Sequence, residues 1–385
     1  MKLPEKKMLK NIDYPFVLAL LAILGLSIVV MPSATAALAA SDLATRHVRS
    51  ILIGLIAMTF ILASDYSQWQ RYSKYLYVIN IIILLLVFSP LGHVAGGVAP
   101  GEGARRWIDI GIFTFQPTEL AKILIIIAFA DFLAKRQGKL ETFKQFFPCF
   151  AFIGIPTLLI IRQPDLGTSL VFIAILLGMM FIAGANVKLL VGLFTGGMAA
   201  VIGVIYTYLR WEPSWLPMPL EGFQLNRLIA FLDPDAHSAD ASFQLIQSKV
   251  AIGSGGVTGQ GLFQGSQIQL RFLPEQHTDF IFSVVGEELG FIGAVILLAL
   301  YFFLIYRSID IMAHAKDMFG VLMVAGVTSM LLFHILVNVG MTMGVMPITG
   351  IPLPLFSYGG TSMVSNLIAL GIVLNVNIRR KKIIF

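Results

Sequence analysis

The sequence is short of charge. Only 12% of its 385 residues are Asp, Glu, Lys or Arg, whereas 57% are hydrophobic. A soluble domain carries about 25% charged residues, so this chain has too few to cover a globular surface facing water. Since a helical bilayer span takes roughly 20 apolar residues, the composition predicts a polytopic integral membrane protein. The longest apolar runs lie at 81–88, 123–130, 171–183 and 295–306.

Other chemistries are excluded by what is missing. The one cysteine, Cys149, lies inside an apolar run, which excludes a disulfide framework and a thiolate metal site. No set of His, Cys and carboxylate residues has metal-ligand spacing, and no Gly-x-Ser-x-Gly elbow of a serine hydrolase is present. The glycine-rich stretch 253–261 lacks the lysine of a P-loop and a strand before it, so it predicts no nucleotide site.

We expect an all-α fold of about ten transmembrane helices in a single domain, 1–385. Lys and Arg crowd the segments that face one side if both termini are cytoplasmic, as the positive-inside rule requires. The same bias explains the net charge of +6, so we expect no nucleic-acid partner. No small-residue cleavage site follows the first apolar run, which we therefore interpret as a retained span. The expected spans are 14–31, 50–63, 75–88, 118–134, 147–161, 166–183, 189–209, 280–306, 319–339 and 362–376.

Two extracytoplasmic segments stand out in this arrangement. One is 89–117, which is rich in glycine before Arg105, Arg106 and Trp107. The other is the long loop 210–279, between spans seven and eight. Loops of that length are usually functional or disordered. Because this loop mixes aromatic residues with charges, we expect it to pack on the membrane face with short helices of its own.

Ionisable residues at the level of the spans are candidates for function, because a charge in hydrocarbon is costly. In the segment 116–122, Glu119 and Lys122 are three residues apart and share a helical face. The alternative is a purely structural ion pair. In the segment 162–168, Asp165 faces the same choice between a functional role and simple capping of the next helix.

The densest cluster is 273–288, where the long loop meets an apolar run. It holds Glu275, His277 and Asp279, followed by Glu287 and Glu288. Carboxylates buried there without a partner would have raised pKa values, which suits proton transfer. The alternative is a helix capped by Asp279, with a paired acid below it.

The segment 347–361 contains three prolines and three glycines, which do not continue a helix. Non-helical backbone at membrane depth is tolerated only against protein or a wet cavity. We interpret this segment as a re-entrant lining of a cavity; a plain loop between spans is the alternative.

Together these clusters resemble the SEDS family (shape, elongation, division and sporulation), whose motifs they match in order along nearly the whole chain. The stretch 247–256 is more similar to the rod-shape branch of the family than to its division branch, while 210–220 matches no motif. The matching segments are 103–108, 116–122, 163–168, 272–282 with 287–290, and 350–362.

The resemblance implies a peptidoglycan glycosyltransferase of the bacterial cytoplasmic (inner) membrane. It implies polymerisation of the substrate lipid II into glycan strands on the extracytoplasmic face during cell elongation. The implied partners are a class B penicillin-binding protein acting as transpeptidase, other proteins of the elongation complex and membrane lipid. The resemblance also marks Asp279 as an essential residue.

On this reading Asp279 is the general base that takes a proton from the acceptor hydroxyl. The leaving diphosphate needs positive charge, for which Arg106 and Lys122 are preferred, with a divalent cation (Mg or Mn) as a possible addition. Trp107 is expected to stack on a sugar or line the lipid groove. The full set of expected substrate-binding residues is Arg106, Trp107, Gln116, Glu119, Lys122, Asp165, Lys249, His277, Glu287, Ser357 and Thr361.

Three other functions are open. A lipid II flippase would use the same lipid and line a path through the membrane with charge, whereas the ionisable groups here gather on one side. A proton-coupled transporter would normally show a midplane acid or broken helices in paired halves, and Asp131 is the one inner-side acid well inside a span. A scaffold would not need several polar motifs at membrane depth.

Overall fold

The computed structural model describes residues 11–36, 42–94, 105–109, 114–136, 139–211, 222–232, 240–270 and 272–380. Helices occupy all ten segments in which apolar spans were predicted. They are α2 (Tyr14–Ala36), α3 (Leu43–Ala63), α4 (Tyr66–Leu86), α5 (Pro117–Ala134), α6 (Phe143–Ile161), α7 (Leu166–Ile182), α8 (Val187–Trp211), α12 (Ile281–Ala313), α13 (Met318–Thr342) and α14 (Gly360–Ile378).

Seven of the described helices are long and apolar enough to cross a membrane, and α7 is equally apolar but shorter. The remaining two are more polar. Helix α5 carries Glu119, Lys122 and Asp131, and α4 begins with a polar stretch that includes Arg71 and Lys74. The three charged residues of α5 are buried and find partners inside the bundle, as hydrocarbon supplies none, whereas Arg71 and Lys74 are exposed.

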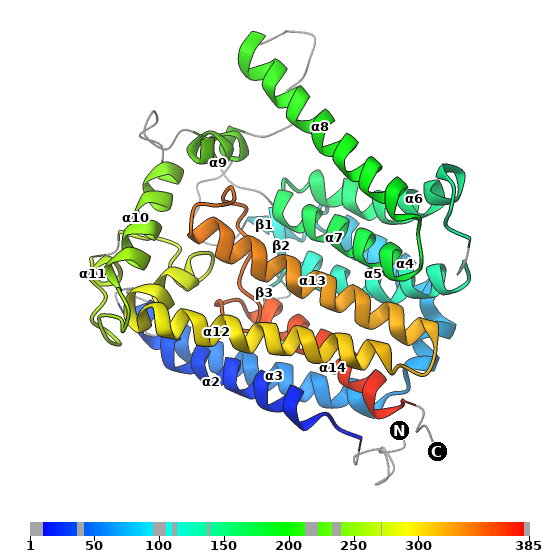
Figure 1. Cartoon of the computed structure of the whole chain (residues 1–385), viewed down its shortest axis with the longest axis horizontal. Coiled ribbons are helices and arrows are strands. Elements are labelled where there is room, and N and C mark those ends of the chain that lie inside the picture. The colour runs from blue at the N-terminus through cyan, green and yellow to red at the C-terminus, as the bar shows by residue number, and fades with distance from the viewer. Residues whose placement is uncertain are drawn as a thin grey trace.

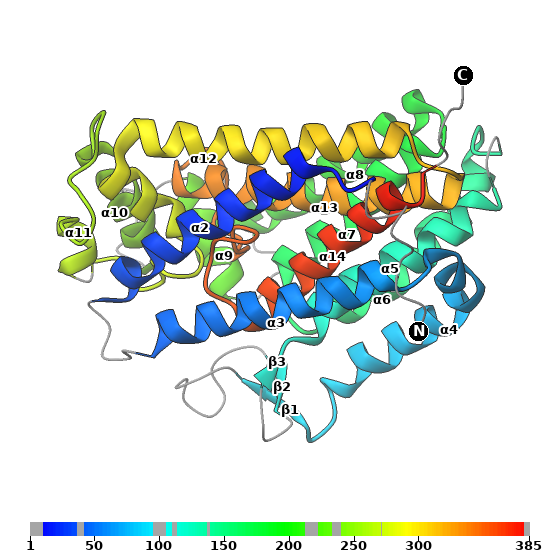
Figure 2. The same ribbon diagram turned by 90° about the horizontal axis from the view of Figure 1, so that it is seen from below.

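Most of the long helices run side by side along the longest dimension of the molecule, whereas α8 leaves the bundle at an angle (Figure 1). Helix α13 lies in the middle and packs against α5, α7, α12 and α14, and α3 lies along α14 (Figure 2). The first described residues and the end of α14 are joined, because the amide of Asn377 donates to the carbonyl of Asn11 over 2.7 Å. Apolar side chains on the outside, such as Leu18, Phe60 and Phe147, are exposed, as expected of surfaces that face lipid.

Three short helices, α9 (Gly222–Leu232), α10 (Asp240–Ser254) and α11 (Ser266–Gln269), lie at the end of the bundle where α12 begins (Figure 1). The prediction that the long loop contains helices of its own is confirmed. The preceding outer segment departs from the all-α expectation. It forms an antiparallel sheet of β1 (Gly92–Val94), β2 (Arg105–Asp109) and β3 (Thr114–Phe115), in which His93 pairs with Trp107.

The glycine-rich stretch packs against a kink in α12. Gly290 interrupts the helix with a φ of 65°, and its neighbour Phe291 donates its N–H to the carbonyl of Gly256 over 2.9 Å. A Cβ on Gly255 would lie 1.9 Å from the carbonyl oxygen of Gly286. The absence of side chains at this contact lets the two backbones meet, which gives the glycines a packing role.

Candidate active site

The segment between α13 and α14 is non-helical, as predicted, and lies against the residues that precede α12. Asn338 donates from its amide to the carbonyls of both Asp279 and Ile351, each over 2.8 Å. The hydroxyl of Ser357 donates to the carbonyl of Thr278 over 2.6 Å and accepts the N–H of Leu353 over 2.8 Å. Two polar side chains thus fix the backbone on both sides of Asp279. The hydroxyl of Ser357 is therefore engaged in these two hydrogen bonds.

The carboxyl of Asp279 lies next to Gly350, which has a left-handed φ of 73°. A Cβ at Gly350 would lie 3.4 Å from Oδ2 of Asp279 and 3.0 Å from Nη1 of Arg227. Arg227 comes from α9, in the long loop. An acid at the start of α12 and a guanidinium on the loop therefore both lie beside Gly350. The N-cap of α12 is Phe280, so the alternative in which Asp279 caps this helix is wrong.

The electrostatics of Asp279 suit a base. Burial raises the pKa of Asp279 to about 6, with Glu275 and Asp165 adding to the rise and with Arg227 and Arg106 opposing it. The carboxylate is thus the main form at neutral pH, yet it is a stronger proton acceptor than a solvated aspartate. The two cations that oppose the rise come from β2 and α9, which lie between the long helices in the sequence.

His277 lies beside this acid on the same turn. Burial lowers the pKa of His277, against a smaller opposite effect of Glu275. Its carbonyl accepts the N–H of Tyr358 over 2.9 Å, and the two rings are 5.7 Å apart. A neutral imidazole is the expected form near pH 7, so His277 adds no positive charge beside Asp279.

Arg106 reaches the site from β2. Its guanidinium donates to the carbonyls of Gln163 and Pro164 and lies 3.9 Å from Oδ1 of Asp165. Asp165 is the N-cap of α7 and accepts the N–H of Thr168 over 3.1 Å. The capping interpretation is confirmed, and the same carboxyl also orients Arg106.

Gln116 and Thr361 brace the strand that leads into α5. The Gln116 side-chain amide donates to Oδ2 of Asp165 over 3.4 Å, and its backbone N–H donates to the hydroxyl of Thr361 over 3.3 Å. Trp107 is half-buried beside Arg106 on β2. Gln116 thus links Thr361 to Asp165, the carboxyl that lies beside Arg106.

Glu119 and Lys122 are in contact with each other, as their spacing predicted. Nζ of Lys122 lies 2.9 Å from Oε1 of Glu119 and 3.2 Å from Nε2 of His334, and Ser365 donates to the other oxygen of Glu119 over 2.9 Å. Lys122 is only 1% exposed. This closed arrangement favours the structural ion pair over a direct contact of Lys122 with diphosphate.

Glu287 and Glu288 hold the turn between α10 and α12. Glu287 accepts the N–H of Gln267 over 2.9 Å, and Glu288 accepts the N–H of Phe263 over 3.0 Å. Lys249 is exposed on α10, with its aliphatic chain beside Gly344. The structure therefore does not bring Glu287 or Lys249 to the carboxyl of Asp279.

Sequence reasoning missed Arg227, Gln224 and Asn338. Gln224 donates to the carbonyl of Pro164 over 3.2 Å, so α9 bridges from Asp279 to the turn that holds Arg106. Asn338 carried a readable signal, since an amide in an apolar span needs partners. Arg227 carried none, because it lies near the part of the loop without a recognisable motif.

A divalent cation at the diphosphate stays a prediction. Within the described ranges, no group of three or more His, Cys, Asp or Glu side chains is arranged to hold a metal ion. Asp279, Asp165 and Glu275 do not converge as a ligand set.

Comparison with known proteins decides the family. Residues 12–382 match the family of FtsW/RodA/SpoVE cell cycle proteins. The chain belongs to that family. The resemblance to the SEDS family is thereby confirmed, and the chain is a multi-pass membrane protein.

Among members of the family, a probable peptidoglycan glycosyltransferase FtsW of Geobacter sp. (strain M18) is 39% identical over 86% of this chain and 85% of its own length. The peptidoglycan glycosyltransferase MrdB of Escherichia coli K12 is 37% identical over 96% of this chain and 95% of its own length. This FtsW/RodA/SpoVE protein is accordingly a peptidoglycan glycosyltransferase. Members of the division branch and of the rod-shape branch match this chain at similar sequence identity. Sequence identity therefore does not assign the chain to one of the two branches.

The fold agrees with the family. A chain of a peptidoglycan synthase complex, in a structure on the coordination of polymerization and crosslinking, superimposes with a TM-score of 0.79 at 29% identity. The match covers 96% of this chain and 99% of that chain.

Proposed function

We propose that this chain polymerises lipid II into glycan strands and that Asp279 is the base. In the reaction, a sugar hydroxyl of one substrate attacks the anomeric carbon of another. Asp279 takes the hydroxyl proton as the new C–O bond forms, and the bond to phosphate breaks with lipid diphosphate leaving. The observation that carries this proposal is the carboxyl of Asp279, with a pKa raised to about 6, which lies beside Gly350 together with the guanidinium of Arg227.

Arg227 and Arg106 would stabilise the leaving diphosphate. Both act on the charge of Asp279, and a guanidinium suits the paired oxygens of a phosphate. A preorganised cation lowers the barrier because it meets charge that develops only as the bond breaks. Arg106 was predicted for this role from the sequence. Arg227 takes the role that was predicted for Lys122, which is enclosed by Glu119 and His334.

We further propose that the chain acts in cell elongation. The support is the stretch 247–256, which is more similar to the rod-shape protein RodA than to FtsW. The RodA of Treponema pallidum is 33% identical and covers 96% of this chain. Loss of rod shape on depletion of the protein, with septa still forming, is the expected phenotype. Filaments without septa would instead assign it to division.

The proposed topology has ten spans in the bacterial cytoplasmic membrane, with both termini in the cytoplasm and Asp279 on the outer side. The proposed partner is a class B penicillin-binding protein, together with other elongation-complex proteins. The similarity to a chain of a peptidoglycan synthase complex supports a partner of this kind. Cysteines introduced singly beside the termini and in the long loop, and labelled from each side, test the topology.

The decisive experiment incubates purified protein with labelled lipid II, with and without its cognate transpeptidase. Asp279→Asn should abolish polymer while the protein still inserts and folds. Glu141→Gln is the matched control, because Glu141 is exposed and lies just before α6, outside the candidate active site. An Asp279→Asn protein that polymerises at the wild-type rate would refute the base assignment. Wild-type protein that moves lipid II across vesicles without making polymer would establish the flippase alternative.

A further inference from the structure

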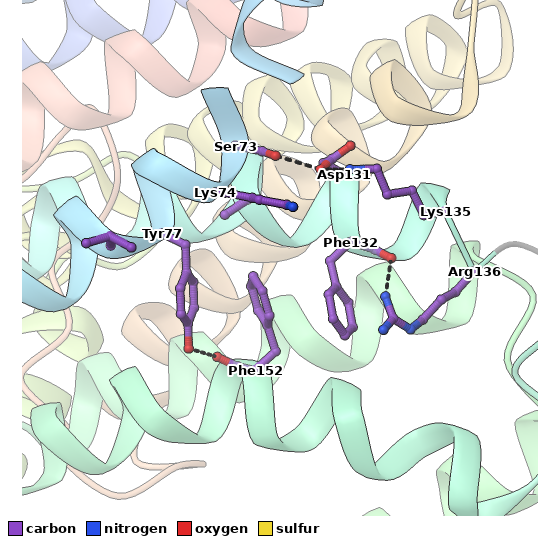
Figure 3. Close-up of a pocket in the computed structure, with 10 residues that line it drawn as sticks. Ser73, Lys74, Tyr77, Asp131, Phe132, Lys135, Arg136 and Phe152 are labelled. Atoms are coloured by element: carbon purple, nitrogen blue, oxygen red, sulfur yellow. Dashed lines mark hydrogen bonds and ion pairs between the residues drawn. The ribbon is translucent and has the colours of Figure 1, made fainter. Parts of the chain in front are cut away.

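A groove of about 440 Å³ lies between α4, α5 and α6, at the opposite end of α5 from Gln116 (Figure 3). An adjoining hollow shares Ser73, Lys74, Asp131 and Lys135 with it. None of these residues touches the candidate active site, and the proposed reaction makes no use of them.

One wall of the groove is aromatic. The ring of Phe152 lies 4.2 Å from that of Tyr77 and 4.5 Å from that of Phe132, measured between centroids. The hydroxyl of Tyr77 donates to the carbonyl of Phe152 over 3.0 Å, which fixes the row of rings (Figure 3). Val78, at the edge, is 53% exposed. The wall therefore continues into the apolar surface that faces lipid.

The rim of the groove is basic. Its one acid, Asp131, is 3% exposed and already has partners in Lys135, at 2.5 Å, and Ser73, at 2.6 Å. The guanidinium carbon of Arg136 stacks 3.6 Å from the ring centre of Phe132. Lys74 is exposed and forms no hydrogen bond or ion pair with any described residue. Three cations thus surround one acid, so the rim carries a net positive charge.

We propose that this groove binds an anionic phospholipid of the adjacent leaflet. The headgroup phosphate lies between Lys74, Lys135 and Arg136, and the first part of an acyl chain lies on the row of Tyr77, Phe152 and Phe132. Basic pockets between transmembrane helices recognise anionic headgroups because surface charge and apolar burial act together. A soluble phosphate would contact the same cations but would leave the aromatic wall uncovered. Because this wall continues into the apolar outer surface of the protein, a lipid is the better fit.

The test uses the full-length protein in detergent and measures binding of phosphatidylglycerol by native mass spectrometry. Phosphatidylcholine with the same acyl chains and inorganic phosphate serve as the comparison ligands. The wild type should bind phosphatidylglycerol at least about tenfold more tightly than phosphatidylcholine. Equal binding of the two lipids, or displacement of the lipid by millimolar phosphate, would overturn the proposal.

Lys74→Gln removes a cation without breaking a contact, so folding is preserved. It should weaken phosphatidylglycerol binding about fivefold, and Lys74→Gln/Arg136→Gln by more than tenfold. Lys188→Gln is the matched control, since Lys188 is an exposed cation in the first turn of α8 and does not line the groove. Val78→Trp fills the apolar edge and should weaken both lipids. Variants of Lys74 that bind like the Lys188 control would refute the site.

Discussion

Replacing Arg227 with glutamine should move the pH dependence of polymerisation upward. The guanidinium of Arg227 opposes the rise in the pKa of Asp279, so its loss raises that pKa further. Both groups lie within 3.4 Å of the position that a Cβ on Gly350 would take, and an opposite charge that close shifts a carboxyl pKa by about one unit or more. Because a base acts only when ionised, activity rises with pH through this pKa, and the acid limb should move from about 6 towards about 7.

The loss should therefore depend on pH. At pH 6, the ionised fraction of Asp279 falls from about one half to about one tenth, which is a roughly fivefold loss. At pH 8 the ionised fraction is nearly unchanged, so the loss that remains there measures the role of Arg227 at the diphosphate. The assay is the initial rate of lipid II polymerisation from pH 5 to pH 9 at subsaturating substrate, since that regime reports the free enzyme.

Two control variants test whether the shift in the pH profile comes from the charge of Arg227. Arg227→Lys keeps the charge and should restore the midpoint of the acid limb. Arg210→Gln removes an exposed cation from the last turn of α8 and should leave the profile unchanged. An Arg227→Gln profile whose midpoint stays in place or moves to lower pH would show that Arg227 does not act on the base.

Further predictions concern the frame of the site. Lys122→Met leaves Glu119 buried without a cation and should lower the free energy of unfolding in detergent by about 3–5 kcal/mol, whereas adding Glu119→Gln should recover most of it; additive losses would argue against the pair. Gly255→Ala places a Cβ 1.9 Å from a carbonyl oxygen, while Gly253→Ala meets nothing within 4 Å. The first should destabilise the protein and the second should not, and equal melting temperatures would contradict the packing role of this turn. Asn338→Leu leaves two carbonyls unpaired, at about 1–3 kcal/mol each. This variant should lower kcat more than it raises KM. An unchanged kcat would show that the hydrogen bonds of Asn338 to Asp279 and Ile351 are not needed for catalysis.

The ten helices could be placed from the sequence because each is a local pattern of apolar residues. The capping role of Asp165 and the pairing of Glu119 with Lys122 were also readable, since both depend on residues three apart. The small sheet β1–β3 was not, because its strands have two to five residues and hold together only by pairing with one another.

The site itself depends on contacts between distant segments. Asp279 was identified from its motif and its place at the mouth of a span, but its neighbours were not. Arg227 reaches it only because α9 folds back over Gly350, and Ser357 became a brace only because Thr278 lies beside it.

The sequence by itself determined that this protein lies in the membrane and where its helices run. These properties follow from composition and short-range periodicity, which need no knowledge of the fold. Only the tertiary structure decided which charges are enclosed in pairs and which lie beside Asp279. That choice depends on burial and on partners far away in the chain. It is why Lys122, which the sequence favoured, is enclosed by Glu119 and His334, while Arg227 stands beside the acid.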